Sequence, residues 1–157
     1  MSNSTLGVMM TKLLILMVLL LLALSGCLNN IAEKKQDGSD IKVETALLDK
    51  LWELQSFGSI GSEIKVLPDT KVTLQFGLDE KITGAGGCNQ YFASYKIGAG
   101  NSLSIGSIGS TLMYCETSME QEQDYFKALG NVSTFALEQN SLQLFYDEGQ
   151  GVLNFAR

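Results

Sequence analysis

Residues 84–91 read GAGGCNQY, in which three glycines and an alanine precede Cys88 and Asn89 follows it. A glycine-rich run before a cysteine suits four kinds of site: a phosphate-binding loop, an exposed nucleophile, a metal ligand, or a close approach of two backbone segments that lets a disulfide form. Each kind needs different residues elsewhere in the chain. The remaining sequence therefore decides what this stretch does.

Catalytic and metal chemistry finds little support in the composition. The chain contains no histidine, which excludes Ser-His and Cys-His pairs, a histidine general base and histidine metal ligands. A phosphate loop would need Lys-Ser/Thr after the glycines and then a helix, whereas a strand-like segment follows here. Lys81 and Lys96 are the cations nearest to Cys88 in sequence, and Cys88 and Cys115 alone make no metal-ligand set. We expect no enzymatic activity, no metal and no cofactor.

The charge balance bears on possible partners. The chain carries 17 Asp and Glu against 11 Lys and Arg, a formal net charge of −6. Binding to nucleic acid needs a basic face that neutralises phosphates, and here only Lys34 and Lys35 are adjacent. We expect no nucleic-acid partner.

The first 26 residues have the pattern of a secretory signal peptide. Lys12 precedes the apolar segment LLILMVLLLLAL at 13–24, and small residues follow. The apolar run is shorter than the roughly 20 residues of a membrane span. The LSGC at 24–27 is similar to a bacterial-type lipobox, in which cleavage before the cysteine accompanies lipidation of its thiol. We expect a lipidated Cys27; an uncleaved signal anchor with a chance cysteine is the alternative.

Residues 27–46 comprise the lipidated cysteine and a flexible tether in this interpretation, because the segment is polar and lacks apolar periodicity. A diacylglycerol anchor carries two acyl chains, which suffice for stable attachment. We expect an exported protein on the extracytoplasmic face of the cell envelope. Its partner there is the membrane, through the lipid, and its folded domain occupies residues 47–157.

Alternating apolar residues predict strands through most of this domain. In KVTLQF at 71–76, for example, Val72, Leu74 and Phe76 share one face, and Trp52 is interpreted as a core residue. Further strands are expected from about Leu51 and at 63–66, 81–84, 91–97, 102–105, 109–113, 132–138, 141–146 and 152–155. Short turns between them favour antiparallel hairpins. The fold class is therefore α+β, mostly β: a strongly curved antiparallel sheet or partly open barrel of about eight strands, with one helix packed on it.

The single helix is expected after Cys115. Thr117 and Glu120 have the spacing of a capping box, and Gly130 is placed to end the helix. The buried face is predicted from apolar side chains at roughly helical spacing: Met119, Tyr125, Phe126 and Leu129. The acidic residues of EQEQD at 120–124 are interpreted as its solvated face.

The cysteines favour a disulfide. Export permits oxidation, and once Cys27 is lipidated, Cys88 and Cys115 can pair in only one way. They are 27 residues apart, and closing such a loop stabilises a fold by roughly 3–4 kcal/mol in the chain-entropy model. Two buried free thiols are the alternative.

Taken together, these segments resemble the META/HslJ domain family. The resemblance covers about residues 48–156 and is carried most specifically by ITGAGGCN at 82–89 and TLMYC at 111–115. YFASY at 91–95, the hairpin SLQLFY at 141–146 and the closing VLNF at 152–155 add to it.

The resemblance implies a small β-rich fold with one helix, commonly secreted or lipid-anchored in prokaryotic envelopes and associated with stress responses. It carries no catalytic residues. The matching motif positions are interpreted as structural: Gly87, Cys88, Asn89, Tyr91, Thr111 and Cys115. Asn89 is expected to hydrogen-bond backbone groups in a turn, and Thr111 to join strands.

Two functions remain open from the sequence. The first is a non-enzymatic, membrane-anchored envelope accessory protein that binds a protein or a hydrophobic ligand. The alternative is a thiol-redox module that uses Cys88 and Cys115.

Overall fold

A computed structural model describes residues 45–157 of the chain. The expected signal peptide, the lipidated Cys27 and the tether up to residue 44 lie outside the described residues. Residues 45–47 are helical and lead into the first strand. Within residues 45–157, no helix is long and apolar enough to cross a membrane.

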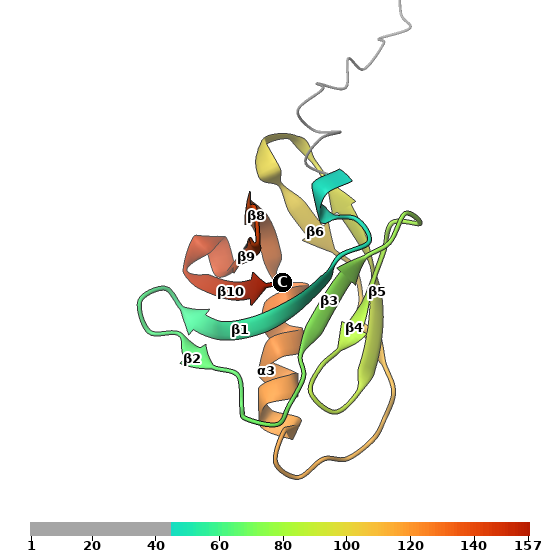
Figure 1. Ribbon diagram of the computed structural model, residues 1–157, viewed down its shortest axis with the longest axis vertical. Coiled ribbons are helices and arrows are strands. Elements are labelled where there is room, and N and C mark those ends of the chain that lie inside the picture. Colours follow the sequence, from blue (N-terminus) through green and yellow to red (C-terminus); the bar gives the residue numbers. More distant parts are fainter. Residues whose placement is uncertain (1–44) are drawn as a thin grey trace, which may run out of the picture. The chain divides into compact units, whose positions relative to one another are not determined.

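Beyond the helical residues 45–47, the described chain folds as a β-rich domain with one long α-helix (Figure 1). Its strands are β1 (Leu51–Ser59), β2 (Ile64–Lys65), β3 (Thr73–Phe76), β4 (Lys81–Ala85), β5 (Gln90–Ile97), β6 (Leu103–Ile105), β7 (Gly109–Ser110), β8 (Val132–Glu138), β9 (Ser141–Tyr146) and β10 (Gly151–Ala156). The α-helix is α3 (Met119–Gly130), and two short 3-10 helices are η1 (Ala99–Asn101) and η2 (Asp147–Gly149).

Eight of these strands follow one another across a single antiparallel sheet. Their order is β6-β5-β4-β3-β1-β10-β9-β8, while β2 pairs with β1 and β7 pairs with β5. The two ends of the sheet approach each other, since Ser102 before β6 forms a bridge with Thr134 of β8. The sheet is thus curled into a nearly closed barrel, which confirms the predicted fold class.

The interior of the barrel is filled by the buried face of each strand. Along β1, Trp52 and Leu54 point inward while Leu51 and Glu53 face solvent, as the alternation of side chains along a strand requires. The expected core position of Trp52 is confirmed. Other core residues with no or almost no exposure include Leu74, Phe76, Ile82, Leu144 and Phe155.

The helix α3 packs on this apolar interior. Figure 1 shows it between β10 and the β4–β5 hairpin, and it contacts β6, β9 and β10. Tyr125 and Leu129 are buried completely, with the Tyr125 ring against Phe155 at a centroid distance of 6.5 Å. Phe126 is half-buried and lies 5.3 Å from the ring of Tyr91. The predicted apolar face of the helix is therefore the one that meets the sheet.

The expected start of the helix needs correction, whereas its expected end at Gly130 is confirmed. The N-cap is Ser118, not Thr117, and no side chain caps the first turn; the buried Ser118 shifts the start by one residue. Gly130 is the last helical residue, and Asn131 follows it as the C-cap, with its N–H directed at the carbonyls of Ala128 and Leu129.

The predicted strand at 109–113 is also too long. Pairing with β5 ends at Ser110, because the segment 111–115 turns away to make the contacts with Cys88 and Asn89 described below. The remaining strands agree with the expected segments within one or two residues.

Candidate functional site

The glycine-rich loop of residues 84–89 closes around a carboxylate of the protein itself. The Oε2 atom of Glu122 on α3 accepts hydrogen bonds from the backbone N–H of Cys88 at 3.0 Å and of Asn89 at 2.6 Å. Successive N–H groups of this kind form a concave anion site. Glu122 is only 3% exposed, so its interpretation as part of a solvated helix face is wrong. The loop does cradle an anion, but the anion is internal.

The glycines leave the room that this carboxylate needs. A Cβ atom on Gly86 would lie 2.6 Å from Glu122 Oε2 and 2.6 Å from Phe126 Cζ, and Gly87 has a φ of +113°. Any other residue would displace the Glu122 carboxylate and the Phe126 ring at the first position and strain the backbone at the second. The run GG at 86–87 thus permits the close approach of α3 to the loop.

Asn89 is the centre of the polar network and is itself buried. Its Nδ2 donates to Glu122 Oε1 at 2.6 Å and to the carbonyl oxygen of Met113 at 3.1 Å. Its Oδ1 accepts from the Met113 N–H and from the Thr111 hydroxyl, both at 2.7 Å. The side chain therefore joins the β4–β5 loop, the segment 111–115 and α3, and one amide satisfies groups from all three.

Thr111 extends the network to the sheet. Its Oγ1 accepts the backbone N–H of Gln90 at 3.2 Å, and its own N–H donates to the Gln90 carbonyl at 3.0 Å. Asn89 thus hydrogen-bonds backbone groups as expected, but those of the distant Met113 and not of its own turn. Thr111 joins its segment to β5, as the sequence suggested.

A disulfide between Cys88 and Cys115 closes the same cluster, with a Cα–Cα distance of 5.9 Å. The expected pairing is present in the structure. Together with the Asn89 network it fixes the segment 111–115 at both ends. We call the group formed by Cys88, Asn89, Thr111, Cys115 and Glu122 the brace.

Tyr91 forms a second buried polar contact, deeper in the core. Its hydroxyl donates to the Thr73 carbonyl at 2.9 Å and lies 2.7 Å from the Tyr125 hydroxyl. The single hydroxyl proton of Tyr91 is used in the hydrogen bond to the Thr73 carbonyl. In the hydrogen bond between the two tyrosines, Tyr125 is therefore the donor and Tyr91 the acceptor. Burial raises the pKa of Tyr91 and of Tyr125 well above 10. Both groups stay protonated at neutral pH and join α3 to the sheet.

The Tyr91 side chain reaches Thr73 by crossing β4 at Gly84. A Cβ atom on Gly84 would collide with the Thr73 carbonyl and lie 2.8 Å from Tyr91 Cε1. Gly84, the first residue of GAGGCNQY, thus leaves the space in which Tyr91, the last residue of the same stretch, reaches Thr73.

The brace offers no evident reaction chemistry. Every oxygen of the Glu122 carboxylate is occupied by protein donors, and within residues 45–157 no three Cys, Asp or Glu side chains come together as metal ligands would. The motif residues act on the conformation of the segment between Thr111 and Cys115.

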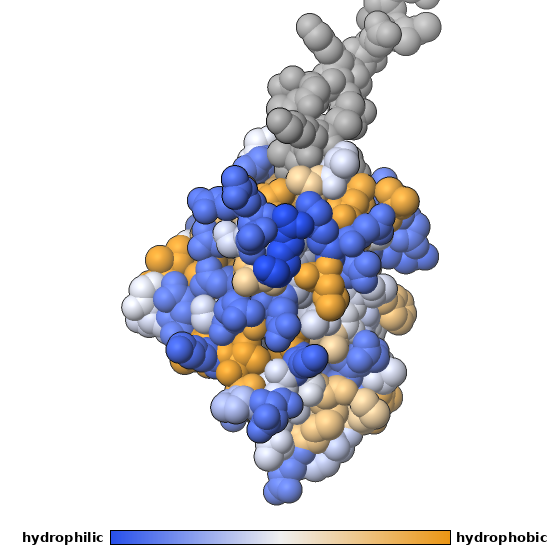
Figure 2. Space-filling model, in the orientation of Figure 1, coloured by the Kyte–Doolittle hydropathy of each residue, from blue (hydrophilic) through white to orange (hydrophobic). Residues whose placement is uncertain are grey.

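That segment displays three consecutive large side chains to solvent. Leu112 is 98% exposed, Met113 55% and Tyr114 80%. Exposed apolar residues are interspersed among hydrophilic ones on the face drawn in Figure 2, and single ones are ordinary on protein surfaces. Three consecutive exposed residues of this kind, on a segment whose two ends are fixed, are not ordinary. We call Leu112, Met113 and Tyr114 the apolar tip.

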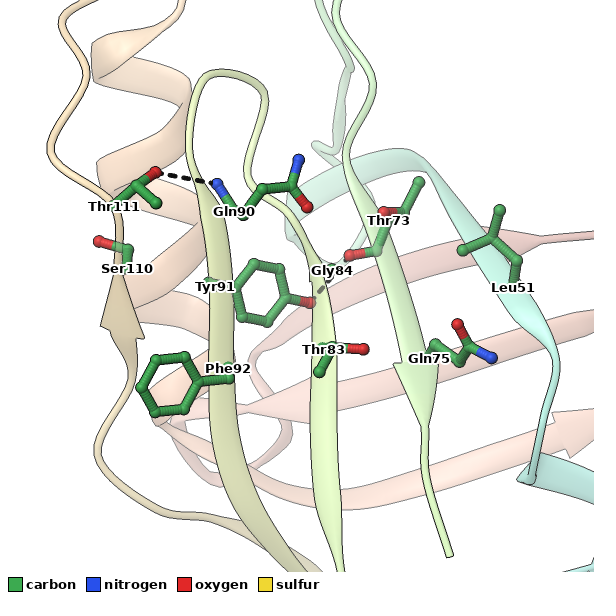
Figure 3. A pocket seen from close by; sticks show the side chains of 10 residues that line it. All are labelled: Leu51, Thr73, Gln75, Thr83, Gly84, Gln90, Tyr91, Phe92, Ser110 and Thr111. Carbon is green, nitrogen blue, oxygen red and sulfur yellow. Dashed lines mark hydrogen bonds between the residues drawn. The ribbon is translucent and has the colours of Figure 1, made fainter.

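Beside the tip, the outer face of the sheet is hollowed into a groove of about 520 Å³ (Figure 3). It is lined by Leu51, Thr73, Gln75, Thr83, Gly84, Gln90, Tyr91, Phe92, Ser110 and Thr111. In Figure 3 the Phe92 ring and the Gln75 and Thr83 side chains come from three neighbouring strands, and the backbone N–H of Gln90 points to the Thr111 hydroxyl. The groove and the tip share the segment that begins at Thr111.

Glu122 is the functional residue that the sequence interpretation missed. A signal was present: Glu122 stands three residues before Tyr125 and seven before Leu129, which is the spacing of one helix face. The groove residues gave no signal, because exposed Thr and Gln on alternating positions are the ordinary outer face of a sheet.

Comparisons with known proteins agree with this architecture. The model of the META domain family matches residues 45–157. No curated protein matches the chain. An NMR structure of a protein from Burkholderia xenovorans is 28% identical with a TM-score of 0.64, covering 74% of this chain and 86% of that one.

Two further solved structures share the fold alone. A crystal structure of a DUF4847 family protein from Bacteroides vulgatus is 16% identical, with a TM-score of 0.54 and coverage of 73% of this chain and 96% of that one. Another NMR structure is 18% identical, with a TM-score of 0.55 and coverage of 72% and 92%. Since the family model spans the whole described domain, including GAGGCNQY and the apolar tip, this chain belongs to the META domain family.

Proposed function

We propose that this chain is a non-enzymatic, membrane-anchored envelope lipoprotein, an accessory of envelope assembly or of the stress response. Cys27 carries the lipid, residues 28–46 are the tether, and the META domain docks onto a partner protein through its apolar tip. The pattern LSGC after an apolar segment supports the anchor.

The observation that carries the docking proposal is the exposure of Leu112, Met113 and Tyr114 on a fixed backbone. Exposed apolar side chains are a liability for solubility unless they bind something. Tyr and Met are enriched in protein interfaces. Because the disulfide and Asn89 hold the segment in place before any contact, little backbone freedom remains to be lost on association.

A docking surface on the outside also agrees with the packing of the interior. Trp52, Phe76, Tyr125 and Phe155 fill the barrel with almost no exposure, and the groove of Figure 3 lies on the outer face of the sheet. This favours a partner protein at the tip over a hydrophobic ligand enclosed by the strands.

The experiment is photo-crosslinking in living cells of the native host. A photoreactive phenylalanine analogue replaces Tyr114 in one variant and Leu78 in another, since Leu78 is 78% exposed on the turn after β3, outside the segment held by the brace. We expect a discrete adduct from position 114 and none from position 78. Equal adducts from both positions, or none from position 114, would overturn the docking proposal.

The anchor is tested separately with Cys27→Ser. The wild-type chain is expected in the membrane fraction and the variant in the soluble extracytoplasmic fraction. If the variant stays with the membrane, an uncleaved apolar segment and not a lipid holds the chain.

A further inference from the structure

A single cross-strand row runs over the outer face of five strands. Leu51 pairs with Gln75, Gln75 with Thr83, Thr83 with Phe92 and Phe92 with Gly109. The side chains of this row on β1, β3, β4 and β5 face outward, because the adjoining residue on each strand is buried. These buried residues are Trp52, Leu74, Ile82 and Tyr91. The row therefore places two exposed apolar residues, Leu51 and Phe92, on either side of an amide and a hydroxyl.

The groove along this row is uncharged. The chain has a net charge of −6, yet none of the ten lining residues carries a charge. In the part of the chain that the structure describes, the side chains of Gln75, Thr83 and Gln90 have no hydrogen-bond partner. The groove thus offers free donors and acceptors, and no charged side chain lines it.

The aromatic residue of the row is held in position. A Cβ atom on Gly109 would lie 2.8 Å from Cζ and 3.1 Å from Cε1 of Phe92, so the ring lies directly over the glycine. The ring is nevertheless 60% exposed. Gly109 therefore supports one part of the ring while the rest is open to solvent, and in Figure 3 the ring projects from β5 on the side of the strand that carries Ser110, away from Thr83.

From this arrangement we infer that the groove binds a neutral glycan chain. A sugar ring presents an apolar C–H face, which stacks on an aromatic ring, and a rim of hydroxyl groups, which pair with amides such as those of Gln75 and Gln90. Leu51 and Phe92 are three strand spacings apart, about 14 Å, so the row is long enough for more than one sugar. This site is distinct from the apolar tip and goes beyond the proposed docking function.

A peptide fits the same face less well. An extended peptide gains affinity mainly from main-chain hydrogen bonds to a free sheet edge. Here the backbone groups of β3, β4 and β5 along the row are engaged with neighbouring strands. The groove offers side-chain groups only, and they are of the kinds that recognise uncharged hydroxyl-rich ligands.

The test is a titration of the ¹⁵N-labelled full chain, kept in detergent micelles, with cellotetraose or tetra-N-acetylchitotetraose, followed by ¹H–¹⁵N NMR. A neutral Ala-Ser-Gln hexapeptide is titrated in parallel. We expect saturable shifts of the amides of residues 73–75, 83, 90–92 and 109–111 with at least one of the sugars, and not with the peptide. No saturation with either sugar, shifts elsewhere, or saturation with the peptide instead would overturn the inference.

Two variants test separately whether the Phe92 ring itself and its placement over Gly109 are needed for sugar binding. Phe92→Ser removes the platform, and Gly109→Ala keeps the ring but displaces it from its support. Both should weaken sugar binding about tenfold, which is the loss of one good contact. Leu78→Ser, which removes an exposed apolar residue from a turn outside the groove, should leave binding unchanged. Unchanged binding in Phe92→Ser, with the fold confirmed by its NMR spectrum, would contradict the site.

Discussion

The carboxylate of Glu122 on α3 and the backbone amide of Asn89 are joined by a 2.6 Å hydrogen bond, across 33 positions of sequence. The same two residues are also joined through their side chains, at 2.6 Å. This double contact connects the helix to the loop that carries the disulfide, and through Asn89 to the backbone of Met113. The family motif GAGGCN therefore supplies Cys88 and Asn89 to the brace, and Glu122 joins them from α3.

Replacing Glu122 by Gln should destabilise the domain by about 2–4 kcal/mol, since buried hydrogen bonds to a charged group contribute more than neutral ones. Gln has one acceptor oxygen, and its NH₂ would face donors that now meet a carboxylate. The side-chain amide of Asn89 cannot flip to offer its oxygen to the new NH₂ group, because its Oδ1 already accepts hydrogen bonds from Thr111 and Met113.

Urea unfolding of the variant measures this loss. Glu120→Gln is the matched control: it removes an exposed acid from the same helix and should change stability by less than about 0.5 kcal/mol. Equal effects of the two substitutions would show that the buried position of Glu122 does not matter.

Removing the disulfide with Cys88→Ala and Cys115→Ala should cost about 3–4 kcal/mol, the chain-entropy value for a separation of 27 residues. The domain should remain folded, because the hydrogen bonds of Asn89 and Glu122 are retained. Thermal unfolding and the NMR spectrum of the double variant check both statements. A reduction potential of the wild-type pair well above about −300 mV would instead favour the thiol-redox alternative.

The domain should lose stability above pH 10. Burial raises the pKa of Tyr91 and Tyr125 in the folded state above the value of 10.0 for an exposed tyrosine. The unfolded chain therefore releases these protons first, so their contribution is complete below pH 10 and decreases as the pH rises toward the folded pKa values. In that range the free energy of unfolding decreases by about 1.4 kcal/mol per pH unit for each of the two tyrosines.

Unfolding free energies measured from pH 9 to pH 12 test this dependence. The double variant Tyr91→Phe, Tyr125→Phe should have a shallower decline than the wild type above pH 10, although it is less stable at pH 7 because the Thr73 carbonyl loses its donor. An identical slope in both proteins would show that these tyrosines do not control alkaline unfolding.

Gly84→Ala should destabilise the domain by more than about 3 kcal/mol, the range of severe packing defects. The added methyl group would meet the Thr73 carbonyl and the Tyr91 ring, so Tyr91 would have to leave its partner. Gly130→Ala is the control, since nothing lies within 4 Å of a Cβ there and alanine favours a helix; it should be neutral or stabilising. Chemical denaturation of the two variants gives the comparison.

Strand alternation made most of the fold predictable. Residues such as Trp52, Leu74 and Phe76 alternate with polar neighbours, and the burial of one face follows directly from the two-residue period. The strand predicted at 109–113 was too long, because Thr111 and Met113 leave the sheet to bind Asn89. That partner comes from more than 20 residues away, and local pattern carries no information about it.

Glu122 shows why the site was harder to infer than the fold. Acids on a helix are most often solvated, so composition favours the surface. Its burial depends on the room left by Gly86 and on the free N–H groups of Cys88 and Asn89, which appear only when the helix packs against that loop. The same tertiary contact gives the glycines their role.

The brace holds the segment 111–115 in one exposed conformation, and amide hydrogen exchange at Met113 reports on that conformation residue by residue. The Met113 N–H donates to Asn89 Oδ1, whereas the amides of its neighbours Leu112 and Tyr114 have no hydrogen-bond partner among the described residues. We predict slow exchange at Met113 between two fast-exchanging neighbours, with protection lost in Glu122→Gln while β9 and β10 stay protected. Exchange at Met113 as fast as at Leu112 and Tyr114 in the wild-type protein would show that the brace does not hold this segment.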